Sequence, residues 1–311
     1  ADLGAVYDPD PKRLAAFCKT YPQARPVDSF ERLLDNPSLH LIAAAAVPCD
    51  RGPIGCRVMR AGKDYFTDKT PFTTLEQLAE ARQTAAATGR KYMVYYGERI
   101  HSECAVFAGD LIRQGAIGRV IEVVGFGPHR LNAASRPAWF FERAKYGGIL
   151  CDIGSHQFEQ FLFYSGATGA TILSATVGNF ANPQYPELED FGEAHLVGNN
   201  GATNFVRVDW LTPVASRAWG DGRLFIQGTT GYIELRKYVE VGRGEGGDQL
   251  YLVNDKVEEH HTLTGKVGFP FFGQLILDCL NRTETAMTQA HAFQAAELCL
   301  RAQQQARRLT P

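Results

Sequence analysis

Long apolar runs are scarce in this chain of 311 residues. The longest near the start, LIAAAAV at 41–47, is much shorter than the ~20 residues that a membrane-spanning helix needs. The chain also opens without the charged and then apolar segments that are typical of an export signal. We therefore expect no membrane span and a cytoplasmic protein.

An excess of charge of one sign is also missing. Lys and Arg together number 32, Asp and Glu together number 34, and no block of like charges stands out. Proteins that bind nucleic acid or anionic membranes usually carry a basic patch. We therefore expect a small molecule or another protein as partner, and neither nucleic acid nor a membrane.

Paired cysteines are absent as well. The seven cysteines are odd in number, widely spread, and contain no C-x-x-C pair. Such spacing argues against both a disulfide framework and a zinc site. It fits a reducing compartment.

What the sequence does contain is an alternation of strands and helices over its first hundred residues. Short apolar segments alternate with helical patterns that have their own start and stop signals. The expected strands are 3–8, 39–47, 63–69 and 90–97, and the expected helices are 9–21, 29–37, 52–62 and 74–89. This βαβα order predicts a parallel sheet with right-handed crossovers.

The pattern changes after Gly97. A helix at 101–118 and a strand at 118–127 lead to a Trp-rich loop at 136–148 and a helix at 151–166. From Thr171 onward, segments of alternating polarity predict a run of neighbouring strands, and two helices close the chain. We expect an α/β protein: a Rossmann-type domain over 1–98, then an α+β domain over 99–311 with a large open, mainly antiparallel sheet. The two last helices are expected to pack back on the first domain.

A glycine-rich dinucleotide fingerprint occurs once, as GRGEGG at 242–247, and in the wrong place. It joins two expected strands, so no helix N-terminus follows to receive a pyrophosphate. We interpret it as a hairpin turn.

Asp8 stands at the end of the first expected strand, where an acid typically accepts from ribose hydroxyls about 20 residues after the glycine loop. Only seven residues precede it, so the first strand and glycine-rich loop of a dinucleotide fold are expected upstream of this numbering. The alternative is that Asp8 opens an Asp-Pro turn, and the sequence leaves both open.

Three segments now form one pattern: AVYDPDPKR at 5–13, TDKTPF at 67–72 and GGILCDIGSHQFEQ at 147–160. Together they resemble the Gfo/Idh/MocA family, the glucose-fructose oxidoreductase and inositol dehydrogenase group of NAD(P)-dependent enzymes. The resemblance runs along essentially the whole chain, including WGDGRLFIQGTTGYIEL at 219–235. The family's Glu-Lys-Pro motif appears with an acid swap and one inserted residue, as Asp68, Lys69, Thr70 and Pro71. Its second motif matches without a gap at Gly147, Gly148, Asp152, Gly154 and His156.

The resemblance implies that Lys69 lies beside the nicotinamide ribose and the reacting hydroxyl, and that Asp152 and His156 border the substrate. Elementary chemistry supports these roles, because alcohol oxidation removes a proton while hydride leaves, and histidine titrates near neutrality. At i and i+4 of one helix, Asp152 is expected to orient the His156 ring or bind a substrate hydroxyl. Taken alone, Lys69 is more ordinarily a solvated residue after an edge strand. Taken alone, His156 is as ordinary a core histidine, hydrogen-bonded to Asp152 for structure, as a catalytic one.

Further candidates follow the expected strand ends. Glu98, Arg99 and His101 come after the last parallel strand, where the family commonly contacts nicotinamide or substrate; helix capping or a salt bridge is the alternative. Pro48 follows the strand at 39–47, where the family brings its backbone close to the cofactor. The next residues, Cys49, Asp50 and Arg51, depart from the histidine-bearing segment that is usual in the family.

In the second domain, the candidate sugar contacts are His129, Arg130, Trp139, Tyr146 and Asp190. Asp152, His156 and Glu159 lack the further ligands that would complete a metal site, so none is expected.

The sequence therefore predicts hydride transfer between NAD(P) and a secondary alcohol of a sugar, cyclitol or related polyol. Asp8 favours NAD, because its carboxylate would repel a 2′-phosphate, and the nearby Arg13 leaves NADP open. A homo-oligomer, dimer or tetramer, is expected through the second-domain sheet. The rivals are an NAD-dependent glycoside hydrolase of the same family and, if the phosphate loop is absent, a non-enzymatic binding or regulatory protein.

Overall fold

The first hundred residues fold into short parallel strands flanked by helices, as the sequence predicts. The computed structural model describes residues 1–310. The strands are β1 (Ala5–Val6), β2 (Arg25–Pro26), β3 (Leu41–Ala44), β4 (Asp64–Asp68) and β5 (Tyr92–Tyr95). The helices are α1 (Pro11–Thr20), α2 (Phe30–Leu34), α3 (Pro48–Arg60), α4 (Leu75–Thr88) and the short α5 (Gly97–Ile100).

Local signals explain where these helices begin and end. The Ser29 and Thr74 hydroxyls accept hydrogen bonds from backbone amides in the first turns of α2 and α4. Such capping satisfies amides that have no partner within the helix. Gly89 ends α4 with φ +64°, a left-handed conformation that glycine adopts without strain.

The parallel strands form two sheets rather than one. β1 pairs with β2, and β3, β4 and β5 pair in that order, all in parallel. In the doubly wound order 3-2-1-4-5-6, the first strand of the fold lies between these two groups. The expectation that this strand is encoded upstream of Ala1 agrees with that order and stays a prediction.

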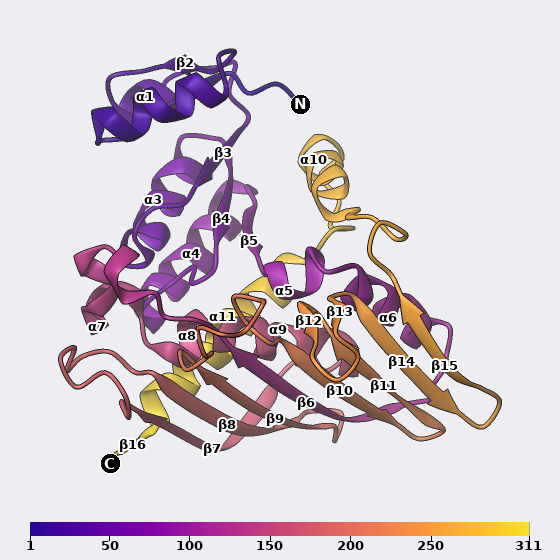
Figure 1. Ribbon diagram of the computed structural model, residues 1–311. Coiled ribbons are helices and arrows are strands. Elements are labelled where there is room, and N and C mark those ends of the chain that lie inside the picture. Colours follow the sequence, from indigo (N-terminus) through magenta and orange to yellow (C-terminus); the bar gives the residue numbers. More distant parts are fainter. Residues whose placement is uncertain (311) are drawn as a thin grey trace.

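The second domain is built on a nine-stranded sheet with the order β15-β14-β11-β10-β6-β9-β8-β7-β16 (Figure 1). β6 pairs with β9, and β7 with β16, in parallel; the other neighbours are antiparallel. The strands are β6 (Val120–Pro128), β7 (Ala170–Gly178), β8 (Phe191–Gly198), β9 (Thr203–Asp209), β10 (Arg223–Gly228), β11 (Gly231–Arg236), β14 (Gln249–Asn254), β15 (Glu258–Thr262) and β16 (Arg307–Leu309). The α/β class and the large, mostly antiparallel second sheet are thus confirmed.

Helices cover one face of this sheet. α6 (Glu103–Arg113), α8 (Ile149–Asp152), α9 (Gly154–Ser165) and α11 (Gln289–Gln305) pack against it, on its upper side in Figure 1. Along β8, every second residue from Gly192 to Gly198 is buried, and the residues between them are partly exposed. This alternation separates a core face from a face that none of the helices within residues 1–310 covers.

The two C-terminal helices return to the first domain. α10 (Phe271–Asn281) places Phe271 and Leu275 against Phe66 and Met93 of the three-stranded sheet. α11 packs on α9, α8 and α4 and so runs along both domains.

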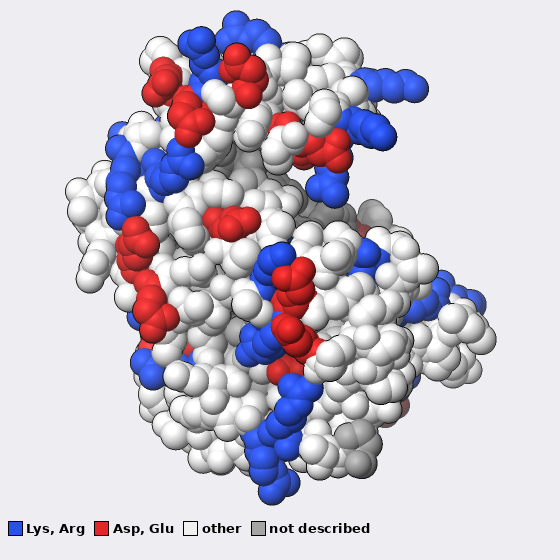
Figure 2. All heavy atoms as spheres, turned by 90° about the vertical axis from the view of Figure 1, so that its left-hand side faces the viewer, with Lys and Arg blue, Asp and Glu red and all other residues white. Residues whose placement is uncertain are grey.

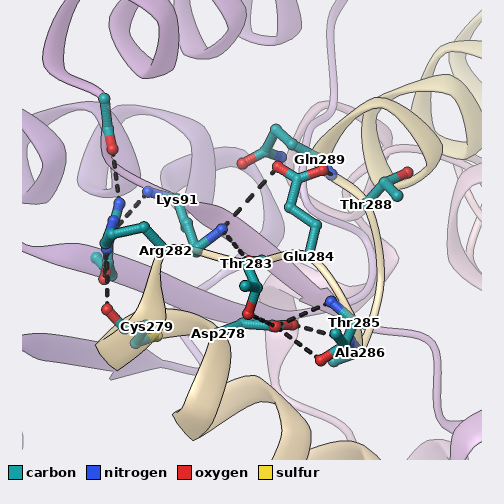
Figure 3. Close-up of polar contacts among 12 residues, drawn as sticks. Lys91, Asp278, Cys279, Arg282, Thr283, Glu284, Thr285, Ala286, Thr288 and Gln289 are labelled. Atoms are coloured by element: carbon teal, nitrogen blue, oxygen red, sulfur yellow. Dashed lines mark hydrogen bonds and ion pairs between the residues drawn. The ribbon is translucent and has the colours of Figure 1, made fainter.

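Asp278 fixes the connection between α10 and α11 (Figure 3). Its carboxylate accepts hydrogen bonds from the Thr283 hydroxyl at 2.6 Å and from the Thr285 amide and hydroxyl at 2.9 and 2.7 Å. The Ala286 amide donates to the second oxygen at 2.8 Å. Burial acts to raise the pKa of Asp278, and these hydrogen bonds outweigh it and lower the pKa to about 2.

Several elements differ from the sequence expectation. The expected loop at 136–148 contains helical turns at Ala138–Phe141 and α7 (Arg143–Tyr146). The expected helix at 151–166 is two helices, because α8 ends at Asp152 and α9 starts at Gly154. The short strands β2 and β16 were not expected; both are too brief for an alternating pattern. GRGEGG, expected as the turn between the strand before it and β14, is a turn only in part: the turn lies at 241–244, and β12 (Val239–Glu240) pairs antiparallel with β13 (Glu245–Gly246), which lies within GRGEGG.

Two observations bear on the expected partners, namely the distribution of surface charge and the length of the helices. Figure 2 shows basic and acidic side chains interspersed over one face of the molecule. Within residues 1–310, no helix combines the length and the apolar character that crossing a membrane requires.

Replacing Asp278 by Asn should lower the free energy of unfolding by about 2 kcal/mol, because the amide accepts fewer and weaker hydrogen bonds. A depressed pKa stabilises the fold above the unfolded value of 3.8, so the deficit should persist from pH 7 to pH 4 and close as the pH falls toward 2. Urea unfolding measures it. Asp255→Asn, at an exposed turn, is the control; an equal loss there would contradict the role of Asp278.

Candidate active site

The two motif segments, distant in sequence, meet at an ion pair. Lys69 directly follows β4, and its Nζ donates to Oδ1 of Asp152 at the end of α8. The neighbouring Thr70 hydroxyl donates to the Cys151 carbonyl at 2.7 Å. The parallel sheet and the second domain are therefore joined where the family resemblance predicts chemistry.

Arg51 fixes the backbone around Lys69 through hydrogen bonds. This buried α3 side chain donates from Nε to the Ala46 carbonyl at 2.7 Å. Its Nη1 donates to the carbonyls of Asp68 at 3.2 Å and Thr70 at 3.3 Å, and also to that of Lys69. One guanidinium thus fixes three consecutive backbone groups. The sequence marked Arg51 only as a departure from the family pattern.

His156 lies in the first turn of α9 and is 6% exposed. Its Nδ1 is buried and has no hydrogen-bond partner among residues 1–310. Burial is the main cause that lowers the pKa of His156 to about 3, and the charges of Lys69, His129 and Lys237 act in the same direction. The ring is neutral at pH 7.

The expected contact between Asp152 and His156 is not formed. Ile153 keeps helical dihedral angles, φ −76° and ψ −40°, but the helical hydrogen bonds become irregular there, since the His156 amide donates to the Ile153 carbonyl at 3.2 Å. The Asp152 carboxylate turns to Lys69 instead, while its backbone carbonyl accepts from Ser155 at 2.7 Å. No hydrogen bond between Asp152 and His156 is formed among residues 1–310, and the alternative, that Asp152 binds a substrate hydroxyl, stays a prediction.

A second ion pair lies buried beneath the first. Glu98 of α5 is 3% exposed and accepts from Lys237 Nζ, 2% exposed, at 2.7 Å. Gln157 Nε2 donates to the same carboxylate oxygen at 2.9 Å. His129 Nε2 lies 3.7 Å from the other oxygen. Residues from the first domain, α9 and two strand ends therefore share one buried cluster.

Burial and charge act against one another in this cluster. For Glu98 and Asp152, burial favours a raised pKa, but neighbouring cations outweigh it. The pKa of Glu98 falls to about 2, chiefly through the charge of Lys237. Lys69, His129 and Arg136 hold the pKa of Asp152 below its ordinary value. Burial also lowers the pKa of His129. The site thus holds two ionised acids and two neutral imidazoles at pH 7.

Four buried polar atoms of this cluster have no hydrogen-bond partner among the described residues. They are Glu98 Oε1, His129 Nδ1, His156 Nδ1 and Gln157 Oε1. Buried polar atoms are almost always hydrogen-bonded, so an unpartnered group of this kind marks a place for water or a ligand.

Two glycines of β6 make room for Gln157. A Cβ added at Gly125 would overlap Gln157 Oε1, and one added at Gly127 would lie 3.0 Å from Gln157 Nε2. The strand can therefore approach α9 only because these positions lack side chains.

The remaining predicted residues have other surroundings. Arg99 donates from Nε to buried Glu159 at 2.7 and 3.0 Å, so its guanidinium is held by α9. The Tyr146 hydroxyl donates to the Glu187 carbonyl and accepts from the Glu189 amide. Trp139 is half-buried beside Phe140, and Asp190 accepts from backbone amides of its own loop. Within residues 1–310, none of these side chains forms a hydrogen bond or an ion pair with Lys69, Asp152 or His156.

The parallel-strand ends fit parts of a dinucleotide. Asp8 follows β1, Pro48 opens α3 after β3, and Lys69 follows β4, all at the edge where open α/β sheets bind ligands. Asp8 Oδ1 accepts from the Asp10 amide at 2.8 Å, the turn expected as the alternative, and leaves Oδ2 without a hydrogen bond in the described chain. These residues fit the ribose and nicotinamide ends, and the unpartnered atoms near Lys69 fit a ligand there. A glycine-rich turn for the pyrophosphate is not among residues 1–310.

Metal ligation finds no support in the described residues, where no group of three or more His, Cys, Asp or Glu side chains is arranged to hold an ion. Glu159, considered as a ligand from its spacing, is paired with Arg99 and lies 3.0 Å from His291 Nε2.

Comparison with known families agrees with this geometry. Residues 1–96 match the family described as "Oxidoreductase family, NAD-binding Rossmann fold", and residues 107–234 match the "GFO/IDH/MocA C-terminal domain". The chain belongs to the GFO/IDH/MocA family of NAD(P)-binding oxidoreductases. The family resemblance expected from the motifs is thereby confirmed.

Similar proteins come from several bacteria. A solved structure from Erwinia carotovora atroseptica, assigned to the oxidoreductases, is 48% identical, with a TM-score of 0.96, over 100% of this chain and 92% of that one. An aldose-aldose oxidoreductase from Caulobacter crescentus, solved with glycerol, shares the fold: 21% identity and a TM-score of 0.80, over 97% of this chain and 90% of that one. A D-xylose dehydrogenase from Paenarthrobacter nicotinovorans is 26% identical over 131 residues, 40% of this chain. The matches span 34%, 45% and 49% of the curated relatives, which is a third to a half of their length.

The neutral His156 predicts a pH-dependent stability. A histidine whose pKa is about 3 when folded and 6.5 when unfolded binds a proton only in the unfolded state between those values. The free energy of unfolding should therefore fall by about 1.4 kcal/mol per pH unit below pH 6.5 on account of this one ring. In His156→Asn the slope between pH 6 and pH 4.5 should be smaller by that amount, measured by urea unfolding. His40→Asn, at an exposed position, should keep the parent slope; an unchanged slope in His156→Asn would contradict a buried neutral ring.

Proposed function

We propose that the protein transfers hydride between NAD(P) and a secondary alcohol of a sugar, cyclitol or related polyol. The observation that carries this proposal is the Lys69–Asp152 ion pair at the edge of the parallel strands, near enough to act electrostatically on the buried His129 and His156, whose Nδ1 atoms lack hydrogen-bond partners. The match to a D-xylose dehydrogenase supports a sugar-like substrate.

The bound cofactor would accept or return the hydride, and the protein's own residues would manage the proton. A ring with a pKa of about 3 takes up a proton poorly at pH 7, so His156 suits hydrogen bonding to the reacting hydroxyl. Lys69 Nζ is the group that exchanges a proton with the substrate oxygen. The ionised Asp152 accepts from Lys69 Nζ and so orients it.

Glu98 and Arg99 take supporting roles in this proposal. Each is buried in an ion pair, with Lys237 and Glu159 respectively, and cannot reach a cofactor without leaving a buried charge unpaired. Glu98 positions His129 and Gln157, whereas Arg99 anchors α5 to α9. Asp8 and Pro48 remain the proposed cofactor contacts, and the Asp8 carboxylate favours NAD.

Self-association through the open sheet face is also proposed. This face carries stacked Phe225 and Tyr232, with ring centroids 5.0 Å apart, and none of the described helices covers it. Sedimentation velocity should give a mass of two or four times 34.3 kDa, and Tyr232→Lys should reduce it. A mass of one chain for the parent protein would contradict this interface.

Lys69→Ala should abolish turnover, with a loss of at least about 100-fold in kcat. The variant loses the amino group that is proposed to exchange a proton with the substrate oxygen. The assay is the absorbance of reduced nicotinamide across a panel of sugars and polyols, in the protein as it occurs naturally. Lys256→Ala, at an exposed turn, should keep parent activity.

The same panel distinguishes the alternatives. Turnover that survives Lys69→Ala would overturn the proposed mechanism. Release of free sugar from a glycoside without net reduced nicotinamide would instead indicate the hydrolase.

A further inference from the structure

A wall of aromatic rings around Arg136 stands beside the Lys69–Asp152 pair. The Arg136 guanidinium carbon lies 4.4 Å from the ring centroid of Phe140, 4.9 Å from that of Trp210 and 6.0 Å from that of Trp219. The His129 ring, part of the buried cluster, lies 4.2 Å from Trp219 and 5.7 Å from Trp210. The wall and the buried cluster are therefore in contact through His129.

Most N–H donors of the Arg136 guanidinium form no hydrogen bond within residues 1–310. Its Nε donates to the Leu131 carbonyl at 2.9 Å, but its two terminal amino groups donate to none of residues 1–310. No carboxylate within that range lies close enough to form a salt bridge with it. The acid whose charge acts on Arg136 is Asp152, which Lys69 already holds.

The charges of the site then leave one cation over. Lys69 is balanced by Asp152 and Lys237 by Glu98, while His129 and His156 are neutral. Arg136 differs from Arg51, whose guanidinium is held by the backbone carbonyls around Lys69, because the terminal amino groups of Arg136 have no hydrogen-bond partner among residues 1–310 and no acid in that range pairs with it. A half-buried guanidinium held against aromatic rings is preorganised, so its fork can pair with a carboxylate at little cost in side-chain freedom.

We propose that the substrate carries a carboxylate, and that Arg136 binds it while Trp219 packs against the carbon skeleton. The substrate class is thus a sugar acid, a uronate or aldonate, rather than a neutral sugar. This inference rests on the proposed function and narrows it. Trp219 is 43% exposed, which leaves an aromatic face free for a polyhydroxylated ligand. A neutral sugar would have to desolvate Arg136 without pairing its charge.

Binding is tested directly, without the cofactor. Two of the three tryptophans, Trp210 and Trp219, flank Arg136, so tryptophan fluorescence should respond to occupancy. Titrations compare matched pairs that differ in one carboxylate: glucuronate with glucose, and galacturonate with galactose. At least one acid should bind about tenfold or more tightly than its neutral partner.

Variants separate recognition from packing. Arg136→Gln should remove the preference for the acid and leave the affinity for the neutral sugar unchanged, and Arg136→Lys should keep part of the preference. Arg119→Gln, at an exposed position, should behave as the parent protein. Equal affinity for acid and neutral partner, no acid binding, or an equal loss for both in Arg136→Gln would each overturn the proposal.

An activity assay with the same pairs distinguishes this inference from the proposed function. Turnover of neutral sugars alone would refute the sugar-acid inference and leave hydride transfer standing. Acids that bind through Arg136 but never reduce the cofactor would keep the inference and refute the proposed reaction.

Discussion

The buried ion pair between Glu98 and Lys237 is the interaction on which the rest of the site depends. Glu98 follows the last strand of the parallel sheet, and Lys237 follows β11 of the second sheet, so the pair ties the two halves together. Both side chains are almost fully withdrawn from water, where an unpaired charge would cost several kcal/mol. The same carboxylate receives Gln157 and approaches His129, so the junction between the domains also shapes the base of the site.

Above this pair, the backbone is fixed as firmly as the side chains. Arg51 binds three successive carbonyls around Lys69, and Thr70 bonds to the Cys151 carbonyl. A lysine held in this way loses little freedom when it meets a substrate, which is how a scaffold places a reacting group accurately. The proposed chemistry thus relies on residues that never touch the substrate.

Local signals made much of the fold predictable. The strand and helix alternation before Gly97, the caps at Ser29 and Thr74 and the alternating strands after Thr171 each depend on neighbours in sequence. The motif around Lys69 and Asp152 also identified two segments that the fold brings together. The roles of Arg51 and Lys237 depend on partners far along the chain, and a single charged residue gives no local sign that it is buried. Asp152 pairs with Lys69, which is 83 positions away along the chain, and a regular i and i+4 pattern does not reveal such a partner.

The two glycines of β6 extend the site into the sheet itself. Gln157 occupies the space that side chains at Gly125 and Gly127 would fill, and from there it reaches Glu98. The backbone of β6 therefore packs directly against Gln157 of the buried cluster. A methyl group at Gly125 would displace Gln157 from the Glu98 carboxylate. A change in packing on this strand would therefore change the electrostatic environment of the site.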